Sequence, residues 1–238
     1  MKRLLIKITG ESLKKNEPID YDSIYFLYKQ IEPIIKEGYE VGIVVGGGNI
    51  FRGKSLIKKG FTDFKAHYIG MFSTFMNAVA IEEIFSKNGV ECEIFSSIEV
   101  NRIFKYFNFN DVDNALKRKK ICIFPGGTGN PYFTTDSAAA LRAAESKCDI
   151  LIKATKVDGI YSKDPFEYKD AEFYKFIKYD EYLNKNLQIM DITAIDICKS
   201  ANIPIIVINY YKEGVFFDLL IKKEKIGSLI YKEEKWPI

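Results

Sequence analysis

Two glycine clusters follow apolar runs of the sequence and could hold phosphate groups. The cluster GGGN occupies residues 46–49, after EVGIVV, and GGTGNP occupies residues 126–131, after KICIF. Because glycine has no Cβ, the backbone N–H groups of such loops can close on phosphate oxygens. The second cluster leads into a helix that Thr134 or Thr135 can cap, and the dipole at that helix N-terminus also favours an anion. Two clusters of this kind favour phosphate binding over two simple turns.

Two basic residues lie close to these clusters. Lys7 interrupts the apolar run RLLIKIT, and Arg52, one of only five arginines, follows GGGN. A lysine at the carboxyl end of a strand can neutralise a transferring phosphoryl group, and an arginine can bind phosphate through two parallel hydrogen bonds. Taken alone, Lys7 would be interpreted as a solvated edge lysine. Together with the two glycine clusters, these residues indicate phosphoryl transfer between two phosphorylated molecules.

Residues 48–55 also match the P-loop pattern G-x-x-x-x-G-K-[ST]. In a P-loop enzyme the Lys-Ser pair opens a long helix, but here Gly60 follows Ser55 after only five residues. No later strand ends in the aspartate that would hold Mg²⁺, since PIIVI is followed by Asn209 and KICIF by Pro125. The sequence therefore favours a site built from two glycine loops over a P-loop.

The composition excludes several other kinds of site and partner. His67 is the only histidine, which excludes histidine-based triads and multi-histidine metal sites, and no protein-bound metal is predicted. The four cysteines lack C-x-x-C spacing and are interpreted as buried thiols of a protein in the reducing cytoplasm. A net charge of +3 indicates no nucleic-acid partner. No apolar run approaches the roughly 18 residues that a membrane-spanning helix needs.

Short apolar runs alternate with longer amphipathic stretches, the pattern of an α/β fold whose helices cover a largely parallel sheet. The predicted strands occupy residues 3–9, 40–45, 91–95, 120–124, 149–154, 204–209 and 228–232. The predicted helices occupy residues 22–36, 65–86, 111–119, 135–146, 193–201 and 215–222. The irregular stretch from about 158 to 186 is predicted to be a lid or an edge insertion. No linker divides the chain, so a single domain of residues 1–238 with two lobes is expected.

Six segments, in order along almost the whole chain, carry a resemblance to a known family. They are KITGESL (7–13), GGGNIFRG (46–53), YIGMFSTFMNAVAI (68–81), GGTGNPYFTTDSAAALRAAE (126–145), KATKVDGIYSKDP (153–165) and LQIMDITAIDIC (187–198). The sequence thereby resembles the bacterial-type UMP kinases of the amino acid kinase fold family. This resemblance implies a three-layer αβα sandwich with a largely parallel sheet, phosphorylation of UMP to UDP by ATP with Mg²⁺ as cofactor, and a cytoplasmic homohexamer.

The resemblance also implies which residues serve each nucleotide. The expected catalytic residues are Lys7, Arg52, Asp136 and Asp191. The expected ATP-binding residues are Lys7, Ile8, Thr9, Gly10, Gly48, Arg52, Thr155, Tyr161 and Asp164. The expected UMP-binding residues are Gly47, His67, Thr128, Gly129, Asn130, Pro131, Tyr132, Phe133, Thr134 and Thr135. The UMP site is expected in a lobe of residues 1 to about 150, and the ATP nucleoside site in a lobe of residues from about 151 to 238.

Among these residues, Lys7 and Arg52 are expected to stabilise the transferring phosphoryl group, and Asp136 to orient Lys7 together with water or metal. On local sequence alone, Asp136 is equally a first-turn carboxylate, and Asp191 equally a helix cap.

Two departures from the family pattern accompany the resemblance. His67 occupies a position where the family commonly has an aspartate that contacts the UMP ribose, and an imidazole can still hydrogen-bond a hydroxyl or approach the phosphate. KKNEPID (14–20) is shorter than the family loop tied to GTP activation. Two other functions stay open: a non-catalytic uridine-nucleotide sensor, and an enzyme of the same fold that acts on a carboxylate or carbamate.

Overall fold

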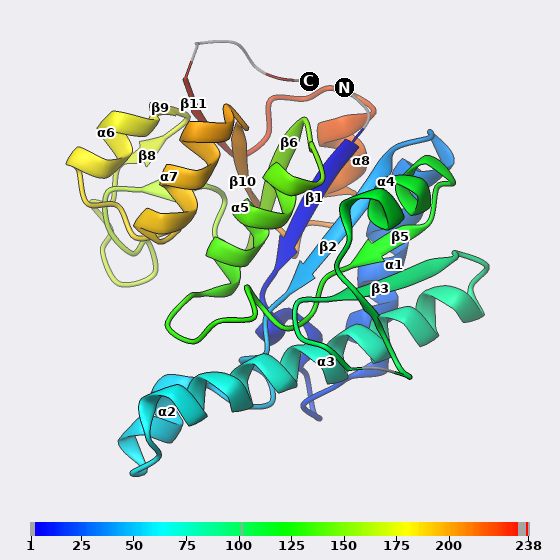
Figure 1. Ribbon diagram of the computed structural model, residues 1–238. Helices are drawn as coiled ribbons and strands as arrows, with labels where there is room; N and C mark the ends of the chain where they lie inside the picture. The colour runs from blue at the N-terminus through cyan, green and yellow to red at the C-terminus, as the bar shows by residue number, and fades with distance from the viewer. Residues whose placement is uncertain (1–2, 101, 233–236, 238) are drawn as a thin grey trace.

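A nine-stranded sheet forms the centre of the protein (Figure 1). The computed structural model describes residues 3–100, 102–232 and 237. The strand order is β4-β3-β5-β2-β1-β6-β10-β11-β9. These strands are β1 (Arg3–Ile8), β2 (Glu40–Val45), β3 (Cys92–Ser96), β4 (Lys105–Tyr106), β5 (Ile121–Ile123), β6 (Ile150–Thr155), β9 (Phe176–Lys178), β10 (Ile205–Asn209) and β11 (Ser228–Tyr231). Every neighbouring pair is parallel except β10 and β11, so the prediction of a largely parallel sheet is confirmed.

Helices cover both faces of this sheet. They are α1 (Tyr21–Lys36), α2 (Gly53–Lys58), α3 (Asp63–Lys87), α4 (Phe109–Lys117), α5 (Thr135–Glu145), α6 (Tyr179–Asn184), α7 (Ile192–Ala201) and α8 (Val215–Leu220), with a 3₁₀ turn, η1, at Gly10–Leu13. One apolar core lies between the sheet and α1, α3 and α8, and a second lies between the sheet and α4, α5, α6 and α7. In Figure 1, α5 and α7 lie in front of the sheet and α1 lies behind it. The expected three-layer αβα arrangement is therefore confirmed.

Strand alternation decides which side chains of β1 and β6 face which layer. Leu4, Ile6 and Ile8 of β1 join the core beneath α1 and α3, whereas Leu5 joins the core beneath α5. Because side chains alternate along a strand, Lys7 is on the α5 face as well. The same count along β6 puts Lys153 on that face, two residues after Leu151. Both predicted apolar runs thus turn one lysine toward α5.

Each long predicted strand and helix is present, with ends that shift by at most two residues. The prediction omitted α2 and the two-residue strand β4, and it left the stretch from 158 to 186 without regular elements. That stretch holds α6, β9 and a small antiparallel pair of β7 (Ile160–Tyr161) and β8 (Phe173–Tyr174). These elements are two to six residues long, too short to give a clear hydrophobic period. Among the helices of the described residues, none has the length and apolar character needed to cross a membrane.

Candidate active site

Two lysine side chains stand next to each other on the central strands. Lys7 of β1 and Lys153 of β6 are direct partners in the parallel register of these strands. Both residues are buried, with 6% and 5% of their surface exposed. Two ammonium groups so close together and so far from water need a counter-charge.

Asp136, in the first turn of α5, supplies that counter-charge. Its Oδ1 lies 2.8 Å from the Nζ of Lys7, and its Oδ2 lies 2.5 Å from the Nζ of Lys153. Burial alone would raise the pKa of Asp136, but the charges of Lys153 and Lys7 outweigh it and lower the pKa to about 2. Two ammonium groups and one carboxylate leave a local charge of 2 − 1 = +1. The Lys7–Asp136–Lys153 cluster can therefore attract an anion to the carboxyl edge of the sheet.

The pKa of Lys153 is lowered by its buried position. Burial lowers its pKa to about 8, and the repulsion from Lys7 acts in the same direction, although the attraction of Asp136 opposes both. Lys153 also donates a hydrogen bond to the carbonyl oxygen of Ile189. Lys153 was not among the site residues expected from the sequence, although DILIKA carries a lysine in an apolar run just as RLLIKIT does. The same pattern, applied twice, would have found it.

Asp191 fastens α7 to the first turn of α5. Its Oδ1 caps α7 by accepting a hydrogen bond from the N–H of Ala194 at 2.9 Å, and it accepts another from the hydroxyl of Ser137 at 2.9 Å. The hydroxyl of Thr134 donates to Oδ2. Thr134 in turn caps α5, since its hydroxyl accepts from the N–H of Asp136 at 3.0 Å. Asp191 is thus a helix cap, as one interpretation of the sequence held, and it also positions the helix turn that carries Asp136.

The loops after β1 and β2 approach each other very closely. A Cβ on Gly10 would lie 2.4 Å from the Oδ1 of Asn49 and 2.6 Å from the carbonyl oxygen of Gly46, so only glycine fits there. Asn49 is buried and exchanges hydrogen bonds of 2.8 Å with Asn77 of α3, whose amide also donates to the Gly46 carbonyl. Asn77 therefore holds the loop after β2 at two residues, Gly46 and Asn49.

Arg52 lies at the open side of this loop. Its Nη2 is 2.7 Å from the Oε1 of Glu11, and its side chain is 61% exposed. A Cβ on Gly48 would be 3.5 Å from the Nε of Arg52, so the guanidinium lies over the glycine loop. Arg52 is paired with Glu11 and is not part of the Lys7–Asp136–Lys153 cluster. A phosphate that binds Arg52 would have to compete with this carboxylate.

The P-loop pattern does not form a P-loop. Residues Gly53–Lys58 form the six-residue helix α2, and Gly60, with a φ of +93°, interrupts the chain before α3 begins. The long helix that should follow the Lys-Ser pair is absent from this part of the described chain. The prediction that this segment is not a P-loop is confirmed.

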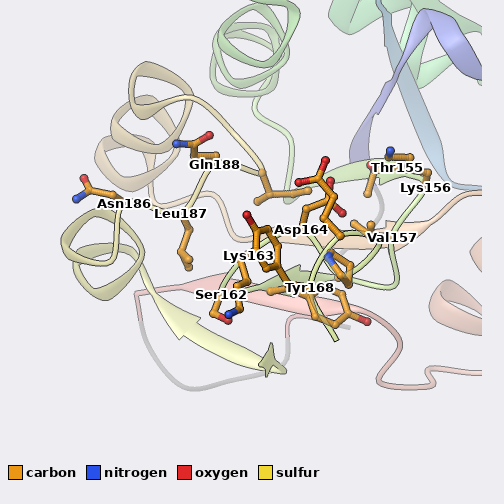
Figure 2. Close-up of a pocket in the computed structure, with 15 residues that line it drawn as sticks. Thr155, Lys156, Val157, Ser162, Lys163, Asp164, Tyr168, Asn186, Leu187 and Gln188 are labelled. Carbon is orange, nitrogen blue, oxygen red and sulfur yellow. The ribbon is translucent and has the colours of Figure 1, made fainter. Parts of the chain in front are cut away.

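A cavity of about 640 Å³ opens beyond the carboxyl end of β6 (Figure 2). The three residues expected to contact the ATP nucleoside, Thr155, Tyr161 and Asp164, all line it. One wall is the chain that follows β6, and the opposite wall includes the segment after α6, residues 186–189 (Figure 2). Its volume lies within the range typical of small-molecule sites. The irregular stretch of the sequence is thus a wall of a cavity.

The residues expected to hold UMP lie mostly on one loop between β5 and α5. This loop spans residues 124–134, and its positive φ values include +87° at Gly126 and +71° at Tyr132. Thr74 of α3 accepts a hydrogen bond of 2.7 Å from the N–H of Gly126 and so fixes the start of the loop. The ring of His67, also from α3, lies 5.0 Å from the ring of Tyr132. The structure therefore places His67 next to this loop, and the sequence analysis had assigned both to the same set of expected UMP-binding residues.

The sheet topology, the two lysines bridged by one carboxylate and the paired glycine loops all agree with one class of protein. The sequence model of the amino acid kinase family matches residues 2–209, and the chain belongs to that family. Among named relatives it is similar to the uridylate kinase of Helicobacter hepaticus (strain ATCC 51449 / 3B1). The two are 40% identical over 232 residues, which cover 96% of this chain and 98% of the relative.

Two solved structures match the fold over nearly its full length. The UMP kinase from Ureaplasma parvum has a TM-score of 0.91 and 38% identity, and the match covers 97% of this chain and 99% of that one. The UMP kinase from Bacillus anthracis has a TM-score of 0.93 and 30% identity, and the match covers 98% of this chain and 96% of that one.

Proposed function

We propose that this protein is a UMP kinase, a nucleoside monophosphate kinase that transfers the γ-phosphoryl group of ATP to UMP and releases UDP and ADP. The observation that carries the proposal is the position of the Lys7–Asp136–Lys153 cluster. β6 runs from Lys153 directly to Thr155 at the wall of the 640 Å³ cavity. The loop between β5 and α5 runs directly into Asp136. The positive cluster thus lies between the proposed sites of the two nucleotides.

In this reaction the protein acts through position and charge. Lys7 and Lys153 stabilise the negative charge on the oxygens of the transferring phosphoryl group, and the loop N–H groups of Gly10 and Gly48 assist. Asp136 keeps both ammonium groups in place before substrates arrive. With a pKa of about 2 it is a poor general base, and a phosphate oxygen of UMP needs none. Arg52 binds phosphate from the open side, where it exchanges Glu11 for the nucleotide.

Mg²⁺ accompanies ATP in the proposed reaction. In residues 3–100, 102–232 and 237, no group of three or more His, Cys, Asp or Glu side chains could hold a metal ion. The carboxylate oxygens of Asp136 already face the two lysines. This donor set suits an ion that is held mainly by the ATP phosphates and their waters. When bound there, Mg²⁺ neutralises charge on the phosphate oxygens.

The UMP site is assigned to Gly47, His67 and residues 128–135. Its wall combines the imidazole of His67 with the exposed rings of Tyr132 and Phe133. An imidazole at this place can hydrogen-bond a ribose hydroxyl or the UMP phosphate. The proposed ATP residues are those of the cavity together with Lys7, Ile8, Thr9, Gly10, Gly48 and Arg52.

Self-association, in the form of a homohexamer, belongs to the same proposal. α3 exposes Phe72, Met76 and Val79 at helical spacing, with 51%, 47% and 44% of their surface accessible. Large apolar side chains on one exposed helix face support contact with another copy of the chain. The reducing cytoplasm is the proposed location, because all four cysteines are free and three of them are buried.

An ATP-dependent turnover assay tests the proposed function directly. The purified protein is given Mg·ATP with UMP, CMP, dTMP, glutamate or carbamate, and ADP release is measured together with UMP binding. A UMP kinase turns over UMP in preference to the other acceptors. Binding of UMP without ADP release would instead identify a nucleotide sensor, and turnover of glutamate or carbamate would identify a different kinase of the same fold.

A further inference from the structure

The segment 189–191, between α6 and α7, contacts the Lys7–Asp136–Lys153 cluster at one end and the start of α5, the helix that carries Asp136, at the other. At one end the carbonyl oxygen of Ile189 accepts a hydrogen bond from Lys153. At the other end Asp191 accepts hydrogen bonds from Thr134 and Ser137, at the start of α5. The segment itself belongs to neither a helix nor a strand. Its position must therefore be fixed by side-chain contacts.

These contacts form a closed ring that includes Lys153 and Asp136. From Ile189 the ring passes through Lys153 to Asp136, whose Oδ2 is 2.5 Å from the lysine Nζ. From Asp136 it passes to the hydroxyl of Thr134, which accepts the Asp136 N–H at 3.0 Å, and then to Asp191. A displacement of the segment would thus move both the ammonium group of Lys153 and the helix turn that carries Asp136.

One buried phenol fixes the middle of the segment. The hydroxyl of Tyr182, from α6, accepts a hydrogen bond of 2.8 Å from the N–H of Met190 and donates one of 3.0 Å to its carbonyl oxygen. Tyr182 is 1% exposed and Met190 is 2% exposed. Burial raises the pKa of Tyr182, so the hydroxyl keeps the proton that it donates. Both backbone polar groups of a buried loop residue are therefore held by a single side chain.

We infer that Tyr182 is a positioning residue for phosphoryl transfer: through Met190 it fixes the segment 189–191, and thereby the placement of Lys153 and of the Asp136 turn. This inference rests on the proposed kinase function. Tyr182 is not itself among the residues proposed to bind either nucleotide. It acts through the segment, whose Ile189 also lines the 640 Å³ cavity, so its loss should change kcat more than the KM for either nucleotide. Phosphoryl transfer is sensitive to displacements of about 1 Å, because its stabilising charges act only at the correct distance.

Tyr182→Phe tests the inference, with Tyr179→Phe as a matched control. Tyr179 lies on the same helix, is 2% exposed and also donates its hydroxyl to a backbone carbonyl, that of Ile203, which precedes β10. Both variants remove a buried phenol hydroxyl, which makes two hydrogen bonds in Tyr182 and one in Tyr179, so Tyr182→Phe should lose somewhat more thermal stability. We expect kcat to fall about 10-fold in Tyr182→Phe, a larger change than in the KM for ATP or for UMP. Tyr179→Phe should keep its kcat.

A kcat for Tyr182→Phe within about twofold of that for Tyr179→Phe would overturn the inference. Hydrogen exchange provides a measurement that does not depend on either variant. In the unmodified protein the Met190 amide should be protected although it lies outside every helix and strand, and exchange at the rate of an exposed loop amide would contradict the anchor. If the unmodified protein showed no UMP-dependent turnover, the proposed function would fail. The exchange measurement would still test whether Tyr182 anchors the Met190 amide.

Discussion

Lys7 and Lys153 depend on Asp136 for their close, charged arrangement. Bringing two ammonium groups into a nearly dry site is unfavourable, and a bridging carboxylate compensates both at once. An incoming phosphate brings further negative charge to the same place, so the cluster is prepared for an anion before substrate binds. The three side chains are therefore best understood as one electrostatic unit.

Alanine substitutions should separate the cluster lysines from Arg52. Lys7→Ala and Lys153→Ala should each lower kcat by about 100-fold, because each removes a charge aimed at the transferring group. Arg52→Ala should cost only about 10-fold, since Arg52 is exposed and shares its charge with Glu11. Steady-state kinetics with UMP check this order. A change below about threefold for either cluster lysine would show that it has no part in the transition state.

The pH dependence of kcat/KM should reveal Lys153. Burial lowers the pKa of Lys153 to about 8, so the free enzyme loses this charge as the pH rises through 8. The protonated form is the active one, so kcat/KM for UMP should fall to about half of its plateau at pH 8 and continue to fall at higher pH. Lys153→Arg should lack this alkaline fall, because a guanidinium stays charged. An identical fall in both proteins would assign the ionisation to another group.

At the scale of the elements, the first turn of α5 is held in place by contacts from several other elements. It is capped by Thr134, tied to α7 through Asp191 and placed against β1 and β6 by the cluster. A short helix turn held at so many points can present Asp136 with little freedom. The approach of the loops after β1 and β2 supplies the opposite wall, and it depends on glycine.

Two glycine-to-alanine changes should have opposite effects. Gly10→Ala would place a Cβ 2.4 Å from Asn49 Oδ1 and should separate the loops that follow β1 and β2. The expected loss is about 2 kcal/mol of stability and most of the activity. Gly70, inside α3, faces open space: beyond the helix's own backbone, no atom of the described residues lies within 4 Å of where its Cβ would stand. Gly70→Ala should therefore stabilise the chain by about 0.5–1 kcal/mol. Denaturant unfolding curves measure both changes, and equal destabilisation by both would contradict this account of the loop contact.

The prediction of helices and strands from sequence succeeded where buried residues give a clear pattern of apolar residues along the chain. The runs RLLIKIT and DILIKA are recognisable as strands because only the lysine breaks each apolar stretch. By contrast, α6 and β7–β9 are short, and their stability comes from packing against distant parts of the chain, which no local pattern records. The pairing of Lys7 with Lys153 is likewise a matter of strand register. The inward turn of Asn49 toward Asn77 depends on how α3 crosses the loop.

At the scale of the whole molecule, α3 stands out because it exposes several large apolar side chains. It runs along the lower edge of the molecule in Figure 1. Its inner side packs against the sheet through Ala78 and Ile81, while Phe72, Met76 and Val79 are exposed on the helix. His67 and Thr74 on the same helix contact the loop between β5 and α5. Contacts between chains at α3 would therefore lie close to the proposed UMP site.

Phe72→Glu should reduce self-association. A carboxylate placed in an apolar contact between two copies would lose its hydration without gaining a partner. The dissociation constant of the assembly should therefore rise by a factor of at least about 10. Light scattering after size-exclusion chromatography measures the mass, and Glu83→Gln, an exposed change on the same helix, is the control. An unchanged mass for Phe72→Glu would place the contact elsewhere.

Lys7 and Lys153 are register partners on the neighbouring strands β1 and β6, so the spacing of these strands sets the distance between their backbones. The distance between neighbouring strands, about 4.8 Å, is set by backbone hydrogen bonds and is among the stiffest distances in a protein. Thermal motion of the glycine loops can shift a nucleotide relative to the two lysines, but it can hardly change the span between the strands that carry them. Temperature should therefore alter how often a phosphate reaches the correct place and leave the spacing of these strands nearly constant.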